Sequence, residues 1–411
     1  MLSDGGVTPA TTLRAKAGRL AQKVVPNLDE WQWNRARDRE MARLVAERDY
    51  SGRLGAVRSS VLPGAPRVVI VPKDGPTFDN WKAAGGNFFF EIVQAAREFL
   101  GADVVEVFSP QPEEDVDQWH ERLIRFLIDT DATHLMAMVE TDPDGAGTWN
   151  WDILWDQLSA RWRGIFLGVM FDSAYRWITI PVRRVGRIND RFMLVDICMP
   201  MDGSMVKGRP EVGPVNMPVS NLTMSIVDER IASLPKIHDV SFLGSLYPYR
   251  VEMIEALRAR GVNVAVNPHH GASAALDLEE SRAQQPGYVD YMAGLAQSQM
   301  TINFARSSAG DFFQLKTRVL EAELVGCVVL TDDVDRTDRF WVPGEEFSYF
   351  ATPADVPDLV SELLAEPERL ARMQEAGRAR ARAINVSSFW GGVEEGLARR
   401  KLPGLVVKGT A

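Results

Sequence analysis

Small, polar and cationic residues cluster between two apolar runs in the C-terminal half of the chain. They are Ser307, Asp311, Gln314, Lys316 and Arg318. A diphosphate needs this combination, because hydroxyls, backbone amides and cationic side chains can meet its negative charges together. Two cations at the start of a helix also oppose its macrodipole, and a bound anion would offset that cost. The spacing supports an alternative equally well, a solvated helix start with Lys316 and Arg318 facing water.

Glu321 follows in the same predicted helix. A carboxylate can accept hydrogen bonds from two vicinal hydroxyls at once, which is the usual reason for an acidic residue beside a nucleoside sugar. Glu321 is therefore either a ribose ligand or a solvated helix carboxylate, and the spacing leaves both options open. We expect its neighbour Glu323 to be an ordinary solvated carboxylate.

A glycine-rich turn stands before a predicted helix in the N-terminal half, at Gly85, Gly86 and Asn87. Glycines let the backbone approach a ligand, and the free amides of a helix N-terminus favour a phosphate or a substrate hydroxyl. A simple turn with an Asn N-cap explains the same residues, and is the better interpretation when the motif is taken alone. The turn is neither GxGxxG nor GxxxxGK[ST], so NAD-type and Walker-type sites lose their main support.

A catalytic base is harder to identify. Asp172 follows the predicted strand 165–171, where topology would direct it toward a substrate and let it accept a proton. Asp74 has the same option after the first strand, although a turn cap is the simpler interpretation.

The sequence gives no support for a metal site. The two cysteines, Cys198 and Cys327, lie far apart without metal-ligand spacing, and the His269–His270 pair lacks further ligands. The same two cysteines do not form a disulfide framework, which favours a reducing compartment.

The composition is that of a globular chain with more than one core. The 411 residues are 45% hydrophobic and 25% charged, and this length favours two domains. A formal net charge of -10 argues against nucleic acid as the main partner. The sequence shows neither a signal-peptide pattern nor an apolar run long enough to cross a membrane, so we expect a cytoplasmic protein.

Short β-branched runs alternate with helical stretches along most of the chain. The predicted strands are 67–72, 104–108, 135–139, 165–171, 192–195, 240–244, 262–266, 300–304 and 327–330. The predicted helices are 87–100, 119–129, 151–163, 249–260, 288–297, 315–324, 356–364, 367–383 and 390–399. This order predicts an α/β fold with two parallel sheets, in domains 63–235 and 236–411, and a ligand cleft at the carboxyl ends of the strands.

Residues 1–62 form an N-terminal extension with a different charge balance. Residues 1–60 hold eleven Lys and Arg against seven Asp and Glu. Helical spacing over 13–58 predicts two helices there. We favour packing of this extension along the following domain, and the alternative is docking on an anionic membrane surface or a partner.

Several stretches of the second domain, taken in order, resemble motifs of GT-B glycosyltransferases, most closely those of the CgeB-like, group-1 type. They are VSFLGSLYPYR (240–250), MTINFARS (300–307), KTRVLEAELVGCVVLTDD (316–333) and GEEFSYFATPADVPDLVSELLAEPERLARMQEAGRARA (344–381). The N-terminal run from VVIVPKDG through GGNFFFEIVQAAREFLGADVVEVF resembles the first strand, glycine loop and helix of the same fold. Residues 1–60 lie outside the resemblance.

The resemblance implies two Rossmann-like domains facing a central cleft, with the donor held by the C-terminal domain and the acceptor mostly by the N-terminal one. By position, Glu321 matches the family glutamate that binds the donor ribose, and Lys316 and Arg318 match the diphosphate-binding cations. Gly244 and Ser245 match the loop that approaches the donor phosphates. Gly85 and Gly86 match the N-terminal loop near donor phosphate and acceptor.

The chain departs from the family pattern at one position. Retaining members of the EX7E type carry another acid eight positions before the ribose glutamate, and here that position is Phe313. Asp311 can substitute after a local shift. The departure leaves donor-sugar contacts and stereochemistry open, although the resemblance favours retention.

The resemblance therefore predicts a glycosyltransferase that moves a sugar from a nucleoside-diphosphate sugar to an unknown glycan, protein, lipid or small molecule. It implies no bound metal and no further cofactor. Two alternatives remain. One is a nucleotide-sugar epimerase of the same fold, and the other is a non-catalytic nucleotide-sugar-binding protein, for which Phe313 is the best argument.

Overall fold

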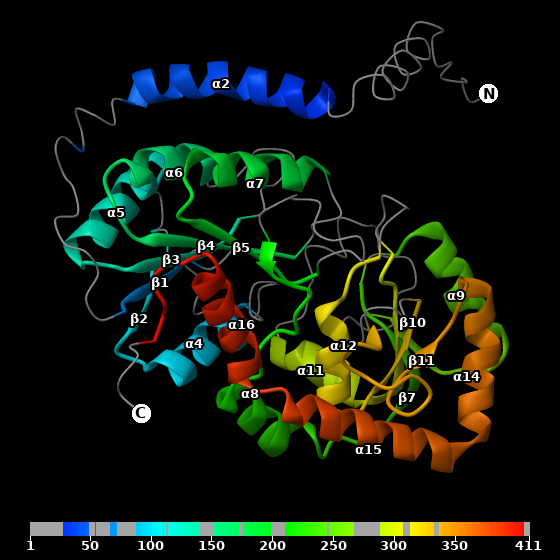
Figure 1. Cartoon of the computed structure of the whole chain (residues 1–411). Coiled ribbons are helices and arrows are strands. Elements are labelled where there is room, and N and C mark those ends of the chain that lie inside the picture. The colour runs from blue at the N-terminus through cyan, green and yellow to red at the C-terminus, as the bar shows by residue number, and fades with distance from the viewer. Residues whose placement is uncertain are drawn as a thin grey trace, which may run out of the picture.

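The structure, a computed structural model, describes a large part of the chain. The described residues are 28–48, 54, 66–71, 88–109, 111, 114–139, 151–171, 176–198, 210–244, 246–266, 288–306, 313–332 and 337–406. They form two parallel β-sheets, each with helices packed against it (Figure 1). No described helix is long and apolar enough to span a membrane.

The first sheet has six strands in the order β2-β1-β3-β4-β5-β6. Its strands are β1 (Val68–Val71), β2 (Val105–Val107), β3 (His134–Met138), β4 (Ile165–Met170), β5 (Phe192–Asp196) and β6 (Pro210–Val212). β1 pairs in parallel with both β2 and β3, so the direction of winding reverses between β1 and β3. Strands β1, β3, β4 and β5 are buried along their whole length, as expected for a sheet covered on both faces.

The second sheet has five strands in the order β11-β10-β9-β7-β8. Its strands are β7 (His238–Phe242), β8 (Val264–Val266), β9 (Ser298–Asn303), β10 (Val328–Thr331) and β11 (Ser348–Tyr349). β7 pairs in parallel with both β8 and β9, so the winding here reverses between β7 and β9. Ligands of open parallel sheets bind beyond the carboxyl ends of the strands at such a switch point.

The helices connect the strands and cover the sheets. They are α2 (Leu28–Arg48), η1 (Phe88–Val93), α4 (Gln94–Leu100), α5 (Val116–Asp129), α6 (Trp151–Ser159), α7 (Arg176–Ile188), α8 (Asn221–Ile226), η2 (Val227–Ile231), α9 (Pro248–Ala259), α11 (Tyr288–Ala296), α12 (Thr317–Leu324), η3 (Pro353–Asp355), α14 (Val356–Ala365), α15 (Pro367–Ala383) and α16 (Val386–Arg399). Local sequence fixes several of their ends. α5, for example, begins at a capping box of Asp115 and Gln118, and its Leu123 and Leu127 are buried.

The predicted α/β alternation is confirmed, and every described strand pair is parallel. The sequence did not predict α7, α8, η2, β6 or β11. α7 contains Pro181, although proline removes a backbone donor and clashes with the preceding turn of a helix. β6 begins at Pro210, and as an edge strand it tolerates the missing donor.

The last helix returns to the first sheet after the second sheet is complete. α16 packs against α4 and β6, and Figure 1 shows it beside the first sheet, whereas α15 lies with the second. Its Trp390 stacks on Phe99 with ring centroids 6.4 Å apart. Just beyond α16, Arg400 donates to the backbone carbonyls of Asp190 and Phe192. Residues of the range 236–411 therefore complete the core of the first domain.

A continuous apolar core joins the two sheets. Buried side chains of the first sheet, such as Ile70 and Met193, belong to the same cluster as Leu320 of α12 and Trp341. Burial of apolar surface stabilises this contact by about 25 cal/mol for each Å² removed from water. The shared core fixes how the helices between the sheets face each other.

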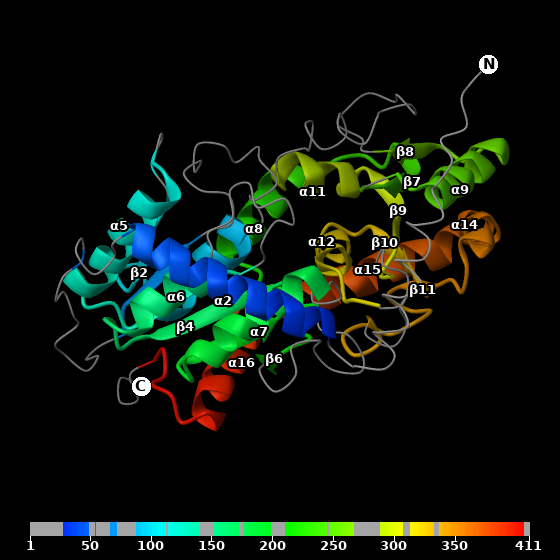
Figure 2. The same cartoon turned by 90° about the horizontal axis from the view of Figure 1, so that it is seen from above.

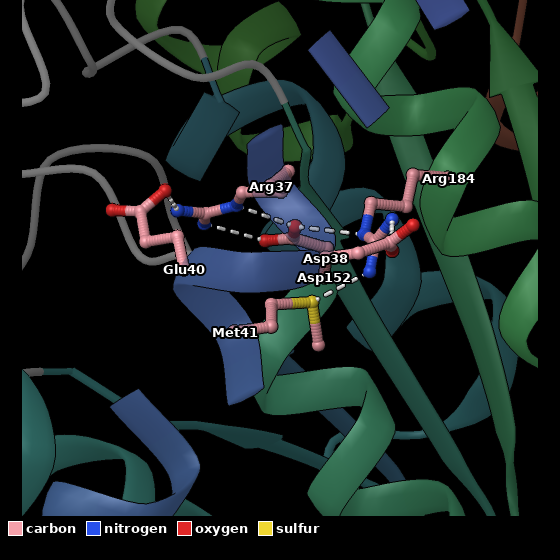
Figure 3. Close-up of polar contacts among 6 residues, drawn as sticks. All are labelled: Arg37, Asp38, Glu40, Met41, Asp152 and Arg184. Atoms are coloured by element: carbon pink, nitrogen blue, oxygen red, sulfur yellow. Dashed lines mark hydrogen bonds and ion pairs between the residues drawn. The ribbon is translucent and has the colours of Figure 1, made fainter. Parts of the chain in front are cut away.

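Helix α2, the described part of the N-terminal extension, packs along α6 and α7 of the first domain (Figures 1 and 2). Arg37 forms a two-pronged pair with Asp152, with nitrogen–oxygen distances of 2.8 and 2.9 Å (Figure 3). Arg184 of α7 forms ion pairs with Asp152 of α6 and with Asp38 of α2. The rest of the 13–58 segment, apart from Leu54, lies outside the described residues, so the second predicted helix is not described.

The charge of α2 bears on the alternative that the extension docks on a membrane. Residues 28–48 hold five arginines and five acidic residues. Arg37 and Arg48 are moreover engaged in ion pairs with the first domain, Arg48 with Asp117 at 2.7 Å. α2 therefore has no net positive charge with which to bind an anionic membrane surface.

We predict that Asp152→Asn destabilises the protein by about 3 kcal/mol, because it leaves the largely buried Arg37 and Arg184 without their shared carboxylate. Urea unfolding followed by tryptophan fluorescence measures the change. Glu40→Gln is the matched control, since Glu40 pairs with the same arginine but is half exposed, and we expect it to change stability by less than about 1 kcal/mol. Equal effects of the two variants would contradict this account of the helix contact.

His134 ties the C-terminal tail to β3 and gives a pH-dependent contribution to stability. Its Nε2 donates to the carbonyl of Pro403 at 3.1 Å, and its Nδ1 lies 2.8 Å from the Thr133 hydroxyl. Burial lowers the pKa of His134 to about 4, although the Pro403 bond acts in the opposite direction. Because the folded pKa is below the ordinary value of 6.5, the stability that neutral His134 contributes is complete above that value and is lost as the pH falls toward 4.

When the pH is lowered from ~7.5 to ~5, we expect the linked protonation of His134 alone to reduce the free energy of unfolding by about 2 kcal/mol. Urea titrations at both pH values, on the wild type and on His134→Gln, isolate its contribution. The variant is expected to lose that part of the pH dependence. An identical pH dependence in both proteins would show that His134 does not titrate in this range.

Candidate functional site

The candidate site is built at the carboxyl end of β7 and β9, where the second sheet reverses its winding. Gly244, just after β7, has a φ of +139°, which residues with side chains rarely adopt. A Cβ atom on Gly244 would lie 3.6 Å from Nη2 of Arg318. The structure therefore brings Gly244, in the loop after β7, next to Arg318 at the start of α12.

The segment that leads into α12 is tethered to the end of β9. The backbone N–H of Gln314, a fully buried residue, donates to the carbonyl of Ala305 at 3.1 Å. Lys316 stands at the N-cap of α12, and its Nζ donates to Oε1 of Gln314 at 2.8 Å. This bond holds the Lys316 ammonium group at the N-terminus of α12. The partial positive charge of the helix dipole at that end favours a bound anion.

Glu321 is a buried carboxylate in the middle of α12, with only 4% of the residue exposed. Its Oε2 accepts a hydrogen bond of 2.7 Å from the hydroxyl of Tyr291 on α11. Burial raises the pKa of Glu321, while the Tyr291 bond and the charge of Arg318 act in the opposite direction. Of the two options left open by the sequence, a solvated carboxylate is wrong.

Arg318 completes this group of polar side chains. Its charge favours the ionised forms of both Tyr291 and Glu321. Burial, followed by the negative charge of Glu321, nevertheless raises the pKa of Tyr291 well above its usual range. Arg318 is only partly exposed, so the interpretation in which it simply faces water does not hold.

The prediction that Glu323 is solvated is also wrong. Glu323 is fully buried, because α12 is covered by α15, whose Gly377 leaves room for the Oε2 atom. Its Oε1 accepts from the backbone N–H of Val329 at 3.3 Å, and burial raises its pKa well above the usual range.

The first domain contributes a second buried carboxylate, which the sequence analysis missed. Glu91 of η1 is 2% exposed and accepts a hydrogen bond of 2.8 Å from the hydroxyl of Tyr288 on α11. Burial first, and then the negative charge of Glu321, raise the pKa of Glu91 well above its usual range. The available signal was a lone acidic residue inside the apolar run Phe88–Val93.

Aromatic side chains surround Arg250 at the same edge of the sheet. The guanidinium carbon of Arg250 lies 4.6 Å from the ring centre of Tyr247 and 4.9 Å from that of Phe304. Tyr249 contacts Phe304 edge to face, with ring centres 5.5 Å apart. These contacts pack the start of α9 against Phe304, just after β9, and none of these residues was predicted as a site residue.

Phe313, at the position of the missing family acid, packs under Arg306. The guanidinium carbon of Arg306 lies 4.9 Å from its ring centre, and the two residues form an isolated antiparallel bridge. This position therefore carries an aromatic–cation contact in place of a carboxylate.

The remaining predicted site residues lie outside the described residues. They are Gly85, Gly86, Asn87, Asp172, Ser245, Ser307 and Asp311, together with Asp74, His269 and His270. Their roles stay predictions. Within the described part of the chain, no three or more His, Cys, Asp and Glu side chains group as metal ligands would.

Comparison with known proteins gives one family and a set of similar folds. Residues 250–386 match the model of a family described as glycosyl transferase-like. This match contains Lys316, Arg318 and Glu321. A comparison with curated protein sequences gave no significant match.

Among solved structures, HepE from Anabaena in complex with UDP matches with a TM-score of 0.50 and 12% identity, over 81% of this chain and 100% of that one. Sucrose-phosphate synthase from Thermosynechococcus elongatus matches with a TM-score of 0.48 and 11% identity, over 82% of this chain and 98% of that one. At this level of identity, the likeness to HepE shows a shared fold.

Proposed function

We propose that this protein, a glycosyltransferase of the GT-B fold, transfers a sugar from a nucleoside-diphosphate sugar to an acceptor. One observation carries the proposal. A buried carboxylate, Glu321, lies on the same short helix as Arg318 and the N-cap Lys316, beside the Gly244 loop at the switch point of the second sheet. A carboxylate for the ribose next to two cations for the diphosphate is the chemistry that a nucleotide-sugar donor needs.

In this proposal the cations act on the leaving group. As the glycosidic bond breaks, negative charge grows on the departing nucleoside diphosphate. Lys316, Arg318, Ser307 and the amides of the loop at Gly244 and Ser245 would stabilise that charge in this proposal, which lowers the barrier to bond cleavage. Gln314 holds Lys316 in place before the donor binds.

The acceptor side of the proposal rests on the first domain. The loop with Gly85, Gly86 and Asn87 would receive the acceptor and the donor phosphates, and Asp172 would accept the proton of the attacking hydroxyl. The reaction would retain the anomeric configuration and need no metal. Cys198 and Cys327 are both buried and are not joined by a disulfide, which supports a reducing, cytoplasmic location for the reaction.

Phe313 supports a second candidate function, binding of a nucleotide sugar without turnover. The acid that contacts the donor sugar in related retaining enzymes is absent at this position. Product analysis with and without an acceptor mixture separates the candidates. Transfer needs an acceptor, an epimerase converts the donor alone, and a pure binder leaves the donor unchanged.

The first experiment is a thermal-shift panel on the purified full-length chain with UDP, GDP, ADP, dTDP and their sugars. At least one is expected to raise the unfolding midpoint, because a ligand that binds the native state stabilises it by mass action. No shift with any of them at millimolar concentration would contradict a nucleotide-sugar donor.

We predict that Lys316→Ala lowers kcat roughly 100- to 1000-fold, because it removes one donor to the developing leaving-group charge. Release of the nucleoside diphosphate from the preferred donor measures the effect. Arg372→Ala, on the exposed face of α15, is the matched loss of one cation and is expected to leave kcat unchanged. A folded Lys316→Ala protein with wild-type kcat would remove Lys316 from the mechanism.

A further inference from the structure

Two tyrosines on one face of α11 each hold a carboxylate from a different domain. Tyr288 and Tyr291 are three residues apart, so they are neighbours on the helix surface. The Tyr288 hydroxyl donates to Glu91 of the first domain at 2.8 Å, and the Tyr291 hydroxyl donates to Glu321 of α12 at 2.7 Å. The two pairs are chemically alike, but only one contains the carboxylate of the proposed donor site.

The Tyr291 contact uses one oxygen of Glu321. Tyr291 donates to Oε2, and no hydrogen bond between Oε1 and another described residue is seen. The positive charge of Arg318 acts on both groups and favours their ionised forms. Tyr291 and Glu321 therefore form a hydrogen-bonded pair near a cation.

The hydrogen bond from Tyr291 restricts the orientation of the carboxylate. A glutamate side chain has three rotatable bonds before its oxygens, and a freely rotating carboxylate loses that freedom when it binds a sugar. Fixing Oε2 before the ligand arrives removes part of this cost, which is the general effect of preorganisation. It also keeps a buried charge paired, without which burial would favour the neutral acid.

We propose that Tyr291 is a positioning residue for the donor ribose, holding Oε2 of Glu321 so that Oε1 accepts from the vicinal 2′- and 3′-hydroxyls of the nucleoside. This inference rests on the function proposed above. It goes beyond that function because it assigns discrimination between ribonucleotides and deoxyribonucleotides to a residue that does not touch the ligand.

The structure offers a matched control in Tyr288. Tyr288→Phe and Tyr291→Phe each remove one phenol hydroxyl that bonds a buried carboxylate, from the same face of the same helix. A general effect of destabilising α11 would appear in both variants. An effect on ribose recognition through Glu321 would appear only in Tyr291→Phe.

The experiment is isothermal titration of the full chain with UDP and 2′-deoxy-UDP, and with GDP and 2′-deoxy-GDP. The measured quantity is the ratio of the deoxyribonucleotide Kd to the ribonucleotide Kd. Both ligands are measured on the same protein sample, so partial unfolding cancels in the ratio. We expect a ratio of about tenfold or more for the wild type, since a hydrogen bond to a charged group is lost.

Tyr291→Phe is expected to lower the ratio by about fivefold or more, and Tyr288→Phe to leave it within about twofold of the wild-type value. Glu321→Gln is expected to lower the ratio as well. Adding Tyr291→Phe to Glu321→Gln should lower it no further, because the carboxylate on which Tyr291 acts is already gone. This double variant contains no buried unpaired charge at position 321, so it keeps the test available if Tyr291→Phe alone does not fold.

Several results would overturn the inference. An unchanged ratio in Tyr291→Phe, an equal fall in both tyrosine variants, or a further fall in the double variant would each show that Tyr291 does not act through Glu321. A wild-type ratio near one would remove Glu321 from ribose recognition. Failure of the wild type to bind any of the four nucleotides would instead contradict the proposed function, and the inference with it.

Discussion

A carboxylate buried between helices needs a partner, and the Glu321 carboxylate is the group on which the candidate site depends. Removing an ionised group from water costs several kcal/mol unless hydrogen bonds and an opposite charge compensate. Tyr291 and Arg318 supply that compensation. Tyr291 comes from α11 and Arg318 from the helix turn before the acid, so the packing of α11 against α12 brings both partners to Glu321.

The two sheets and the helices between them determine where this group lies. Each sheet reverses its winding next to its first strand, between β1 and β3 and between β7 and β9. Open parallel sheets bind ligands beyond the carboxyl ends of the strands at such points. The shared apolar core and the returning helix α16 join the domains. Tyr288 adds a polar contact to Glu91 across the same boundary, so the proposed donor side and the first domain meet on one helix.

The parallel α/β order could be predicted from the sequence, because β-branched runs and helical stretches alternate with clear punctuation. The neighbours Glu321 and Glu323 show where such prediction stops. Both looked compatible with a solvated helix face, yet both are buried, since α12 is covered by α11 on one side and α15 on another. Local periodicity does not reveal how many faces of a short helix are covered. Tyr288, Tyr291 and Glu91 were missed for a related reason, because their pairing joins segments that are distant in the chain.

The most direct test of the account is a crystal structure of the full chain with the nucleoside diphosphate that stabilises it most. We expect the ribose hydroxyls within about 3 Å of Oε1 of Glu321, with Oε2 still bonded to Tyr291, and the phosphates beside Lys316 and Arg318. A nucleotide bound elsewhere, with Glu321 contacting only Tyr291, would contradict it.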